Sequence, residues 1–327
     1  MAYIQMIMKK KISILVPCYN EEKSLPLLYD ALQKVASNNQ SYNWEFLFIN
    51  DGSCDNTLSV LEQLREKDTR CCFVDLSRNY GKEVAMLAGF DYVTGDATVI
   101  MDADLQHPPY VIPQMIAKWE EGYDDVYAQR ITRGKESWLR KRLSLAYYKL
   151  LTKSSRIDVL PNVGDFRLLD RQCIEALRTL REQGRYTKGM YCYIGFRKIA
   201  VQFETQERIA GESSMNYRNL LHLAIEGIMS YTTAPLRFAS VIGAIVSIVA
   251  FLYAIWILIK TIVWGEPVAG FPTIMVAILF LGGVQLLSLG ITGEYLGRVY
   301  NETKRRPVYF ARMYNGERIN AFNEVKE

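Results

Sequence analysis

Apolar runs that each end in a cluster of polar residues occur four times in the first third of the chain. Between them, leucines such as Leu25, Leu28 and Leu32 recur at the spacing of a helix that buries one face. Short buried strands that alternate with amphipathic helices predict an α/β domain with a mostly parallel sheet. The predicted strands are 12–16, 44–49, 72–76 and 97–101, and their polar ends are 17–22, 50–53, 77–82 and 102–108.

Two long uncharged stretches lie in the last third of the chain. Residues 238–259 and 268–293 contain no Asp, Glu, Lys or Arg. A helix of about 20 apolar residues is long enough to cross a bilayer core. Buried helices of a soluble domain explain two such stretches poorly, because only a short link joins them. We therefore expect transmembrane helices at 236–263 and 271–293, joined by an extracytoplasmic link at 264–270.

The charged residues that flank these stretches predict their orientation. The link contains no Lys or Arg, whereas Arg237 precedes the first stretch and several basic residues follow the second. By the positive-inside rule, both ends then face the cytoplasm. Residues 1–11 contain no apolar segment of signal-peptide length. We expect a multi-pass protein of the inner (plasma) membrane, with a cytoplasmic catalytic domain at 1–215 and a cytoplasmic tail at 294–327.

Two further segments combine basic or polar residues with apolar ones at helical spacing. The region 216–235 leads directly into the first uncharged stretch, and it is interpreted as an amphipathic helix at the membrane interface. Residues 137–151 carry a similar pattern. That second segment fits a membrane surface and packing against the sheet or another subunit about equally well.

Composition excludes several other classes of protein. The net charge of +4 is modest and no dense basic face is evident, so nucleic-acid binding is unsupported. The six cysteines form no Cys-x-x-Cys pair, and the two histidines are far apart, which argues against a zinc site. Scattered thiols fit a reducing cytoplasm. Neither Gly-x-Gly-x-x-Gly nor a Walker loop is present, which disfavours dinucleotide-binding and P-loop proteins.

The pair Asp102 and Asp104 is the most informative polar feature. The two acids follow a predicted buried strand, and open α/β sheets bind ligands at strand ends. Carboxylate oxygens suit Mg²⁺ or Mn²⁺, and such a cation can bridge the phosphates of a nucleotide. We therefore expect Asp102 and Asp104 to hold a divalent metal and to act in catalysis.

Five ordered motifs carry a resemblance to a known family. They resemble the inverting family 2 glycosyltransferases of GT-A fold. Within that family they are similar to the polyisoprenyl-phosphate glycosyltransferases, which include dolichol-phosphate mannose synthases and bacterial bactoprenol glucosyltransferases. The resemblance covers essentially the whole chain, and the paired apolar stretches are similar to the bacterial branch. The motifs are PCYNEE at 17–22, NDGS at 50–53, DADLQHPP at 102–109, GDFRLLDR at 164–171 and RIAGESSM at 208–215.

The resemblance implies where the nucleotide sugar binds. It places Asp104 as the more direct metal ligand, with Asp102 sharing the metal or touching the ribose. At Asn50 many relatives carry a second Asp, which puts the contact to the uracil in doubt, although Asp51 remains. The residues that match nucleotide-sugar positions are Pro17, Tyr19, Glu21, Asp51, Asp102, Ala103 and Asp104.

A polyprenyl phosphate acceptor would need cations more than a general base. A phosphate monoester is largely ionised at neutral pH, since its second pKa is near 6. Arginine can hold phosphate oxygens in a bidentate manner. Asp165 matches the segment to which the family's catalytic base is often assigned, and we interpret it as a carboxylate that orients the sugar or the phosphate. The candidates for the acceptor phosphate are Arg130, which follows the predicted strand 125–129, Arg133, Arg208 and Ser213.

The expected reaction is inverting transfer of a hexose to undecaprenyl phosphate, with glucose from UDP-glucose as the favoured donor, for glycosylation of the cell envelope. Galactose, N-acetylglucosamine and a formamido-arabinose remain alternative sugars. A non-catalytic lipid-binding scaffold is the alternative from another class. A processive polysaccharide synthase is disfavoured, because Gln-x-x-Arg-Trp is absent. The resemblance also implies a homo-oligomer, with a tetramer as one form.

Overall fold

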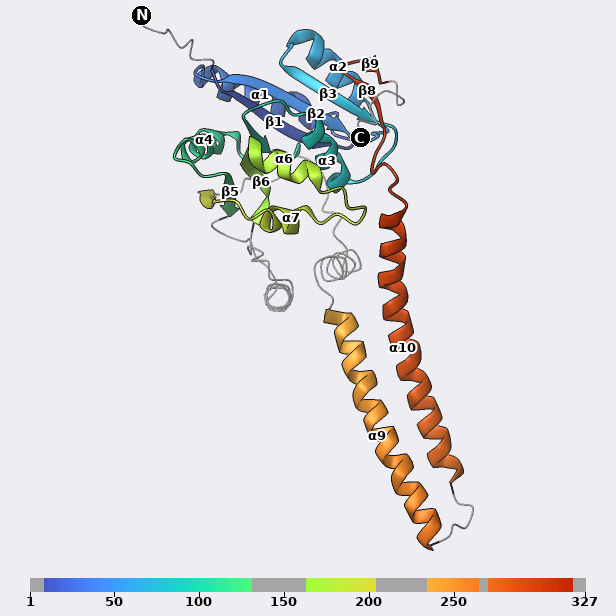
Figure 1. Ribbon diagram of the computed structural model, residues 1–327. Coiled ribbons are helices and arrows are strands. Elements are labelled where there is room, and N and C mark those ends of the chain that lie inside the picture. Colours follow the sequence, from blue (N-terminus) through green and yellow to red (C-terminus); the bar gives the residue numbers. More distant parts are fainter. Residues whose placement is uncertain (1–8, 131–162, 204–233, 265–269, 320–327) are drawn as a thin grey trace, which may run out of the picture.

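The computed structural model describes residues 9–130, 163–203, 234–264 and 270–319. Within these residues, a nine-stranded sheet with helices on both faces forms the main body, and two long helices extend away from it (Figure 1). The strand order is β7-β5-β6-β4-β1-β2-β3-β8-β9.

The four predicted strands form the parallel centre of this sheet. Strand β1 pairs in parallel with β2 and β4, and β2 pairs in parallel with β3. The predicted α/β architecture is therefore confirmed, with strand ends within two residues of the expected positions. The strands are β1 (Lys11–Cys18), β2 (Asn43–Asn50), β3 (Cys71–Leu76) and β4 (Ala97–Ile100).

Helices bury both faces of the parallel strands, which explains why the strands are almost continuously apolar. Helices α1, α2 and α4 pack on the face that carries Ile12, Ile14 and Val16. Helices α3, α6 and α7 pack on the opposite face, around Leu15 and Leu47. The bounds are α1 (Ser24–Asn38), α2 (Thr57–Lys67), α3 (Lys82–Tyr92), a short 3-10 helix η1 (Pro109–Val111), α4 (Ile112–Glu120), α6 (Arg171–Thr179) and α7 (Thr187–Tyr193).

Antiparallel strands flank the parallel centre. Strand β6 (Val163–Asp170) lies between β4 and β5 (Asp125–Arg130) and is antiparallel to both. Strand β7 (Lys198–Phe203) pairs in parallel with β5 at the sheet edge. In the β4–β6 pair Ile100 faces Arg167, so continuing this register by two residues brings Asp165 level with Asp102.

The two long helices form a hairpin after the sheet domain. Helices α9 (Ala234–Trp264) and α10 (Phe271–Thr303) lie side by side (Figure 1). Among the described residues, no helix combines the length and the apolar composition required of a membrane span. After α10 the chain returns to the sheet, where β8 (Ala311–Tyr314) pairs antiparallel with β3 and β9 (Glu317–Arg318) pairs with β8.

Part of the expected domain organisation lies outside the described residues. This holds for segment 137–151, for almost all of the predicted interfacial region 216–235, and for nearly all of the link 264–270. Within the expected tail 294–327, the structure adds the end of α10 and two strands of the main sheet, which the sequence pattern did not indicate.

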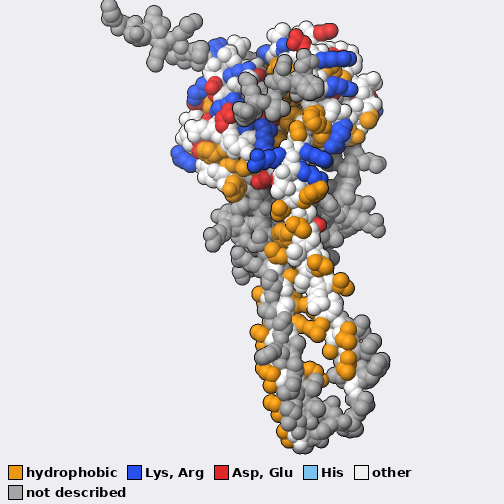
Figure 2. Space-filling model, turned by 45° about the vertical axis from the view of Figure 1, so that its right-hand side comes forward, with side chains coloured by type: hydrophobic (Ala, Val, Ile, Leu, Met, Phe, Trp, Pro, Cys, Tyr) orange, Lys and Arg blue, Asp and Glu red, His pale blue; other side chains and the backbone are white. Residues whose placement is uncertain are grey.

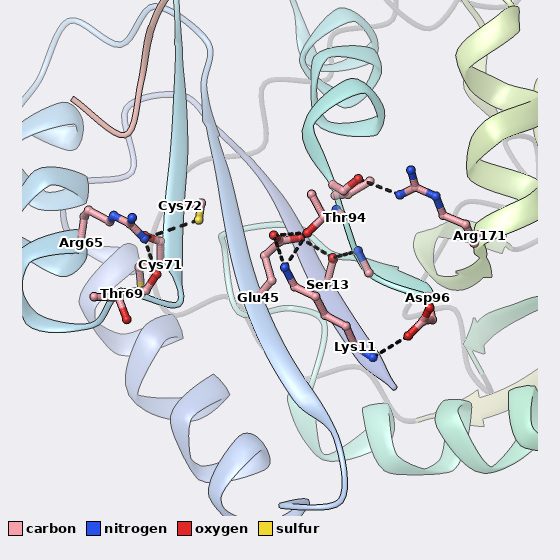
Figure 3. Close-up of polar contacts among 12 residues, drawn as sticks. Lys11, Ser13, Glu45, Arg65, Thr69, Cys71, Cys72, Thr94, Asp96 and Arg171 are labelled. Atoms are coloured by element: carbon pink, nitrogen blue, oxygen red, sulfur yellow. Dashed lines mark hydrogen bonds and ion pairs between the residues drawn. The ribbon is translucent and has the colours of Figure 1, made fainter. Parts of the chain in front are cut away.

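A polar cluster lies near the amino ends of the central strands (Figure 3). The acidic motifs follow the carboxyl ends of these strands, at the opposite edge. The carboxylate of Glu45 on β2 accepts hydrogen bonds from Lys11 Nζ at 2.8 Å and Ser13 Oγ at 2.5 Å, both on β1. It also accepts from the backbone N–H of Thr94 at 3.0 Å and from its hydroxyl at 2.6 Å. These contacts tie β1 and β2 to the segment that enters β4.

Candidate active site

The loops that follow β1, β2, β3 and β4 converge at the carboxyl edge of the parallel strands. Asp51, just after β2, is 3% exposed and fastens the loop after β3. Its Oδ1 accepts from the backbone N–H of Tyr80 and its Oδ2 from that of Gly81, both at 2.8 Å. Burial raises the pKa of Asp51, and these two donors partly offset the rise. The predicted nucleotide-binding acid therefore also shapes the neighbouring loop.

Gly52 lets two of these loops approach closely. Its φ is +64°, and a Cβ at this position would lie 2.4 Å from the backbone carbon of Arg78. Any side chain would therefore collide with the backbone after β3 in addition to straining its own backbone. The NDGS motif thus owes its glycine to the contact between the loops after β2 and β3.

The loop after β4 carries Asp102 and Asp104 and is held in shape by local contacts. The backbone N–H of Asp102 donates to His107 Nδ1 at 3.1 Å. The buried ring of His107 stacks on Phe166, with 4.9 Å between centroids. Asp104 Oδ1 accepts from the backbone N–H of Gln106 at 3.1 Å. His107 therefore acts here as a brace for the acidic loop, a role that the sequence pattern did not indicate.

Lys82 joins the acidic loop to β6. Its Nζ lies 2.5 Å from Asp102 Oδ1 and 2.8 Å from Asp165 Oδ2. Burial lowers the pKa of Lys82, but the two carboxylates outweigh this effect and hold it above its usual range. The structure thus brings together Asp102 and Asp165, two of the predicted site residues, and adds a lysine that the sequence did not single out. In the sequence, its role was indicated only by its position in the polar segment 77–82 after the third predicted strand.

Asp165 is almost enclosed by its surroundings. Its side chain is 11% exposed, and within the described residues its Oδ1 is buried without a hydrogen-bond partner. Burial raises the pKa of Asp165, but Lys82 and Lys188 more than offset this and hold it well below its usual range. A carboxylate with so low a pKa is a weak proton acceptor, since an efficient general base has a pKa near the operating pH.

The remaining predicted donor-site residues lie around the same edge. Pro17 is the second-last residue of β1 and lies opposite Ile49. Tyr19 is exposed just after the end of β1, and Ala103 is buried in the acidic loop. Burial raises the pKa of Glu21; the nearby Asp104 and Asp102 add to the rise, and a hydrogen bond from Ser24 opposes it. The edge therefore concentrates negative charge that a cation would relieve.

Asp102 and Asp104 fit a divalent cation that is completed by substrate. Among the described residues, no group of three or more His, Cys, Asp or Glu side chains is arranged to hold a metal. Mg²⁺ commonly uses one or two protein carboxylates and takes its other ligands from water and substrate phosphates. Two half-exposed hard-oxygen donors in an acidic neighbourhood suit that mode of binding.

Most of the predicted acceptor residues lie outside the described residues. This is the case for Arg133, Arg208 and Ser213. Arg130 is the last residue of β5 and aligns with Phe203 on β7. Its predicted contact with the acceptor phosphate stays a prediction.

Asn50 is explained by a buried neighbour. Its Nδ2 donates to Asp75 Oδ1 at 2.7 Å, and both residues are buried. An Asp at position 50 would place a second carboxylate against Asp75, whereas the amide donates to it. The departure from the family pattern therefore reflects a hydrogen bond between β2 and β3.

Known family models match both the sheet domain and the helical hairpin. A model described as glycosyl transferase family 2 matches residues 13–178, and one described as GtrB C-terminal hairpin matches residues 234–299. The chain belongs to glycosyl transferase family 2. It is therefore a glycosyltransferase, and its sheet domain has the α/β GT-A fold.

Several relatives match this glycosyltransferase over nearly their whole length. The bactoprenol glucosyl transferase of Shigella phage SfX is 44% identical, with 91% of this chain and 98% of the relative covered. A prophage bactoprenol glucosyl transferase homolog of Escherichia coli K12 is 42% identical, with 91% and 97% covered. The putative glycosyltransferase CsbB of Bacillus subtilis is 44% identical, with 93% and 92% covered.

Similarity to solved structures is more remote. Glucosyl-3-phosphoglycerate synthase from Mycobacterium tuberculosis, in complex with Mn²⁺, UDP and glucosyl-3-phosphoglycerate, gives a TM-score of 0.47 at 16% identity, with 67% of this chain and 78% of that chain covered. The TarS fragment 1–349 of S. aureus gives a TM-score of 0.42 at 16% identity, with 60% and 59% covered. The family assignment rests on the family models and the sequence relatives.

Proposed function

We propose that the protein transfers glucose from UDP-glucose to undecaprenyl phosphate, with inversion at the anomeric carbon. The observation that carries the proposal is the extended match to bactoprenol glucosyl transferases, at 42–44% identity over 91% of the chain. The acidic edge formed by Asp102, Asp104 and Asp165 supports a transferase site. Direct displacement by the acceptor phosphate requires no covalent enzyme intermediate.

The binding site for the nucleotide-sugar donor is assigned to the sheet edge formed by the loops after β1, β2 and β4. Asp104, with Asp102 beside it, would hold Mg²⁺ or Mn²⁺, which when bound offsets the charge of the departing diphosphate. Asp51 and Glu21, with Pro17, Tyr19 and Ala103, are assigned to the base and ribose. The position of these residues at one sheet edge supports this division of roles.

On the acceptor side, the nucleophile is a phosphate oxygen that is already ionised. Since its second pKa is near 6, little is gained from proton removal at neutral pH. Arg130, Arg133, Arg208 and Ser213 are proposed to hold this phosphate. Asp165 is proposed to position a substrate or another side chain, which agrees with its low pKa.

The helical hairpin is proposed to sit in the inner membrane, with the catalytic domain in the cytoplasm. The uncharged runs 238–259 and 268–293 and the match of 234–299 to a C-terminal hairpin model support this proposal. Figure 2 shows hydrophobic side chains along the hairpin and Lys and Arg side chains gathered where it meets the sheet domain. The exposed run Lys304, Arg305 and Arg306 follows α10 directly. A homo-oligomer, with a tetramer as one form, remains a prediction from the resemblance.

Transfer to lipid from a panel of nucleotide sugars tests the proposed function. Membranes containing the protein are incubated with undecaprenyl phosphate and radiolabelled UDP-glucose, UDP-galactose, UDP-N-acetylglucosamine or a formamido-arabinose donor. We expect lipid-extractable label from UDP-glucose and none from membranes with the Asp104→Asn variant. If only another nucleotide sugar gives lipid-extractable label, that nucleotide sugar is the donor in place of UDP-glucose. Absence of transfer from every donor, with the folded protein present, would favour a lipid-binding scaffold.

A further inference from the structure

Lys82 occupies the meeting point of three strand-end segments. It is the first residue of α3, after the β3 loop, and its ammonium contacts Asp102 beyond β4 and Asp165 on β6 at 2.5 and 2.8 Å. Because the register of β4 and β6 brings Asp102 level with Asp165, one ammonium can reach both carboxylates. The family motifs used above do not include this residue.

The backbone at Lys82 is held firmly in place. The two preceding N–H groups, of Tyr80 and Gly81, are both bound by the Asp51 carboxylate at 2.8 Å. The helix that follows is anchored by Met86 and Phe90, which are fully buried against the sheet. The lysine is therefore presented from a rigid support, as a binding group must be.

The exposure of Lys82 distinguishes it from an ordinary structural ion pair. In the pair between Arg167 and Asp125, side-chain exposure is 4% and 0%, and the guanidinium also covers the ring of Tyr191. The Lys82 side chain is 41% exposed, although both of its carboxylate partners are more enclosed. An ammonium has three N–H donors. Two are directed at the carboxylates, so a third is available to a ligand on the open side.

A cation is needed at this position in the proposed reaction. The donor diphosphate and the acceptor phosphate are both anions, and they must approach an edge that already carries Asp102, Asp104, Asp165 and Glu21. Preorganised cations that face developing or approaching negative charge contribute strongly to catalysis. Lys82 lies within the acidic group and is partly open to solvent, so it is placed to offset this repulsion.

We infer that Lys82 binds a substrate phosphate oxygen and that Asp165 acts by holding Lys82 in position. The inference rests on the proposed function for the nature of the substrates. The phosphate belongs either to the donor diphosphate or to the acceptor monoester, and separate measurements distinguish the two sources. Lys82 is then a catalytic residue, and Asp165 is a positioning residue.

The test uses the full-length protein and four variants with a matched control. The variants are Lys82→Met, Lys82→Arg, Asp165→Asn and the double variant Lys82→Met/Asp165→Asn. Lys118→Met is the control, because Lys118 forms its ion pair with Glu121 on the surface, at 2.8 Å. Thermal unfolding is measured for each. Lys82→Met leaves the Asp165 carboxylate unpaired and could fail to fold for that reason. In that case the double variant still tests the inference, because it removes the Asp165 charge as well. Lys82→Arg keeps a cation paired with Asp165.

Two binding measurements identify the phosphate without requiring transfer. Affinities for inorganic pyrophosphate with Mg²⁺ and for a short-chain polyprenyl phosphate are measured by calorimetry in detergent. If Lys82 holds the donor diphosphate, Lys82→Met weakens pyrophosphate binding roughly 10-fold or more, as expected for a lost charge-assisted contact. If Lys82 holds the acceptor phosphate, Lys82→Met instead weakens binding of the polyprenyl phosphate. If neither affinity changes more than about twofold while the control behaves as wild type, the inference is wrong.

Transfer kinetics then test the positioning role of Asp165. We expect Lys82→Met to lower kcat/KM roughly 100-fold, on the scale of losing one charge-stabilising donor, with partial recovery in Lys82→Arg. Residues that act through one another are not additive. The double variant should therefore be no more than about threefold worse than Lys82→Met. Additive losses would show that Asp165 acts independently. If wild type binds pyrophosphate and lipid phosphate but transfers no sugar, the proposed function fails while the binding measurements still decide the role of Lys82.

Discussion

Asp75 on β3 accepts a hydrogen bond from Asn50 at one carboxylate oxygen and pairs with Arg312 at the other. The distances are 2.7 Å from Asn50 Nδ2 and 2.6 Å from Arg312 Nε. The Asp75 side chain is fully buried, whereas Arg312 is largely exposed on β8. The last part of the chain is therefore linked through a buried acid to Asn50, the residue before Asp51.

Removing the arginine from this link should destabilise the sheet domain. Arg312→Leu leaves a buried carboxylate without its cation, and we expect the free energy of unfolding to fall by about 1–3 kcal/mol. Chemical unfolding of the purified protein measures the change. Arg318→Leu, on the neighbouring exposed strand β9, is the matched control. Equal stability of both variants would mean that the Asp75 contact contributes nothing.

The metal assignment predicts loss of activity without loss of fold in Asp104→Asn. The amide retains the shape of the side chain and can still accept from the Gln106 N–H, but it is a poorer ligand for a hard cation. We expect transfer to fall by at least about 100-fold, with little change in the unfolding temperature. Chelation with EDTA should abolish wild-type transfer, and Mg²⁺ or Mn²⁺ should restore it. Full activity in excess chelator would rule out the metal.

The low pKa of Asp165 predicts how activity depends on pH. The carboxylate stays ionised throughout the range in which the enzyme can be assayed. Its titration therefore cannot produce the fall in activity on the acidic side of the pH profile, the acidic limb. That limb should instead follow the acceptor phosphate, whose second pKa is near 6, and activity should rise as the pH passes this value. Asp165→Asn should therefore be slower but keep the limb in place. A limb that disappears in the variant, with unchanged KM, would identify Asp165 as the base.

Glu45 provides a pH-dependent contribution to stability at the opposite end of the sheet. Burial tends to raise its pKa, but hydrogen bonds from Lys11, Ser13 and Thr94 outweigh this, and the folded value lies below the ordinary 4.5. Such a carboxylate stabilises the fold above the unfolded pKa, and the contribution is lost as pH falls through the folded value.

Replacement of Glu45 should therefore matter at neutral pH and less in acid. We expect Glu45→Gln to lower the free energy of unfolding by about 1–3 kcal/mol at pH 7. The difference from wild type should shrink as the pH falls below 4.5 and through the lower folded pKa, where the wild-type carboxylate itself becomes protonated. Glu120→Gln, which breaks a surface ion pair with Lys10, is the control and should cost under about 1 kcal/mol. A difference that is constant with pH would contradict the role of the charge.

The proposed membrane orientation predicts which positions are reachable from outside the cell. A cysteine at position 266, in the link without Lys or Arg, should react with an impermeant thiol reagent in intact cells. A cysteine at position 323 should react only after the cells are opened. Both are detected as a mass shift of the purified protein. The opposite pattern would reverse the orientation.

The centre of the fold was predictable because burial on both faces makes parallel strands almost wholly apolar. Strand β6 was missed as a strand, because its GDFRLLDR segment contains charged residues; the structure accommodates Arg167 by pairing it with Asp125. Strand β8 was missed for a different reason. Its ARMY sequence is short, and its partner β3 lies far away in the chain, so no local pattern marks the pairing.

The candidate site was predictable only in part, for similar reasons. Asp102 and Asp104 follow an apolar run, so their position at a strand end could be inferred. Lys82 begins a helix, where a lysine in sequence resembles any solvated charge; only the β4–β6 register shows that two carboxylates meet at it. His107 was set aside because two separate histidines do not form a zinc site, and nothing in the sequence indicated that its ring stacks on Phe166.

The pairing of β8 with β3 has a consequence for the order in which the protein can be completed during synthesis. Asp75 and Arg312 are 237 positions apart, and both long helices lie between them. Since translation proceeds from the amino end, the β3 edge leaves the ribosome long before its partner strand exists. An uncovered strand edge invites pairing with other chains. Chains that stop before Ala311 should therefore be the ones most liable to aggregate, even though every strand-end acid of the catalytic site is present in them.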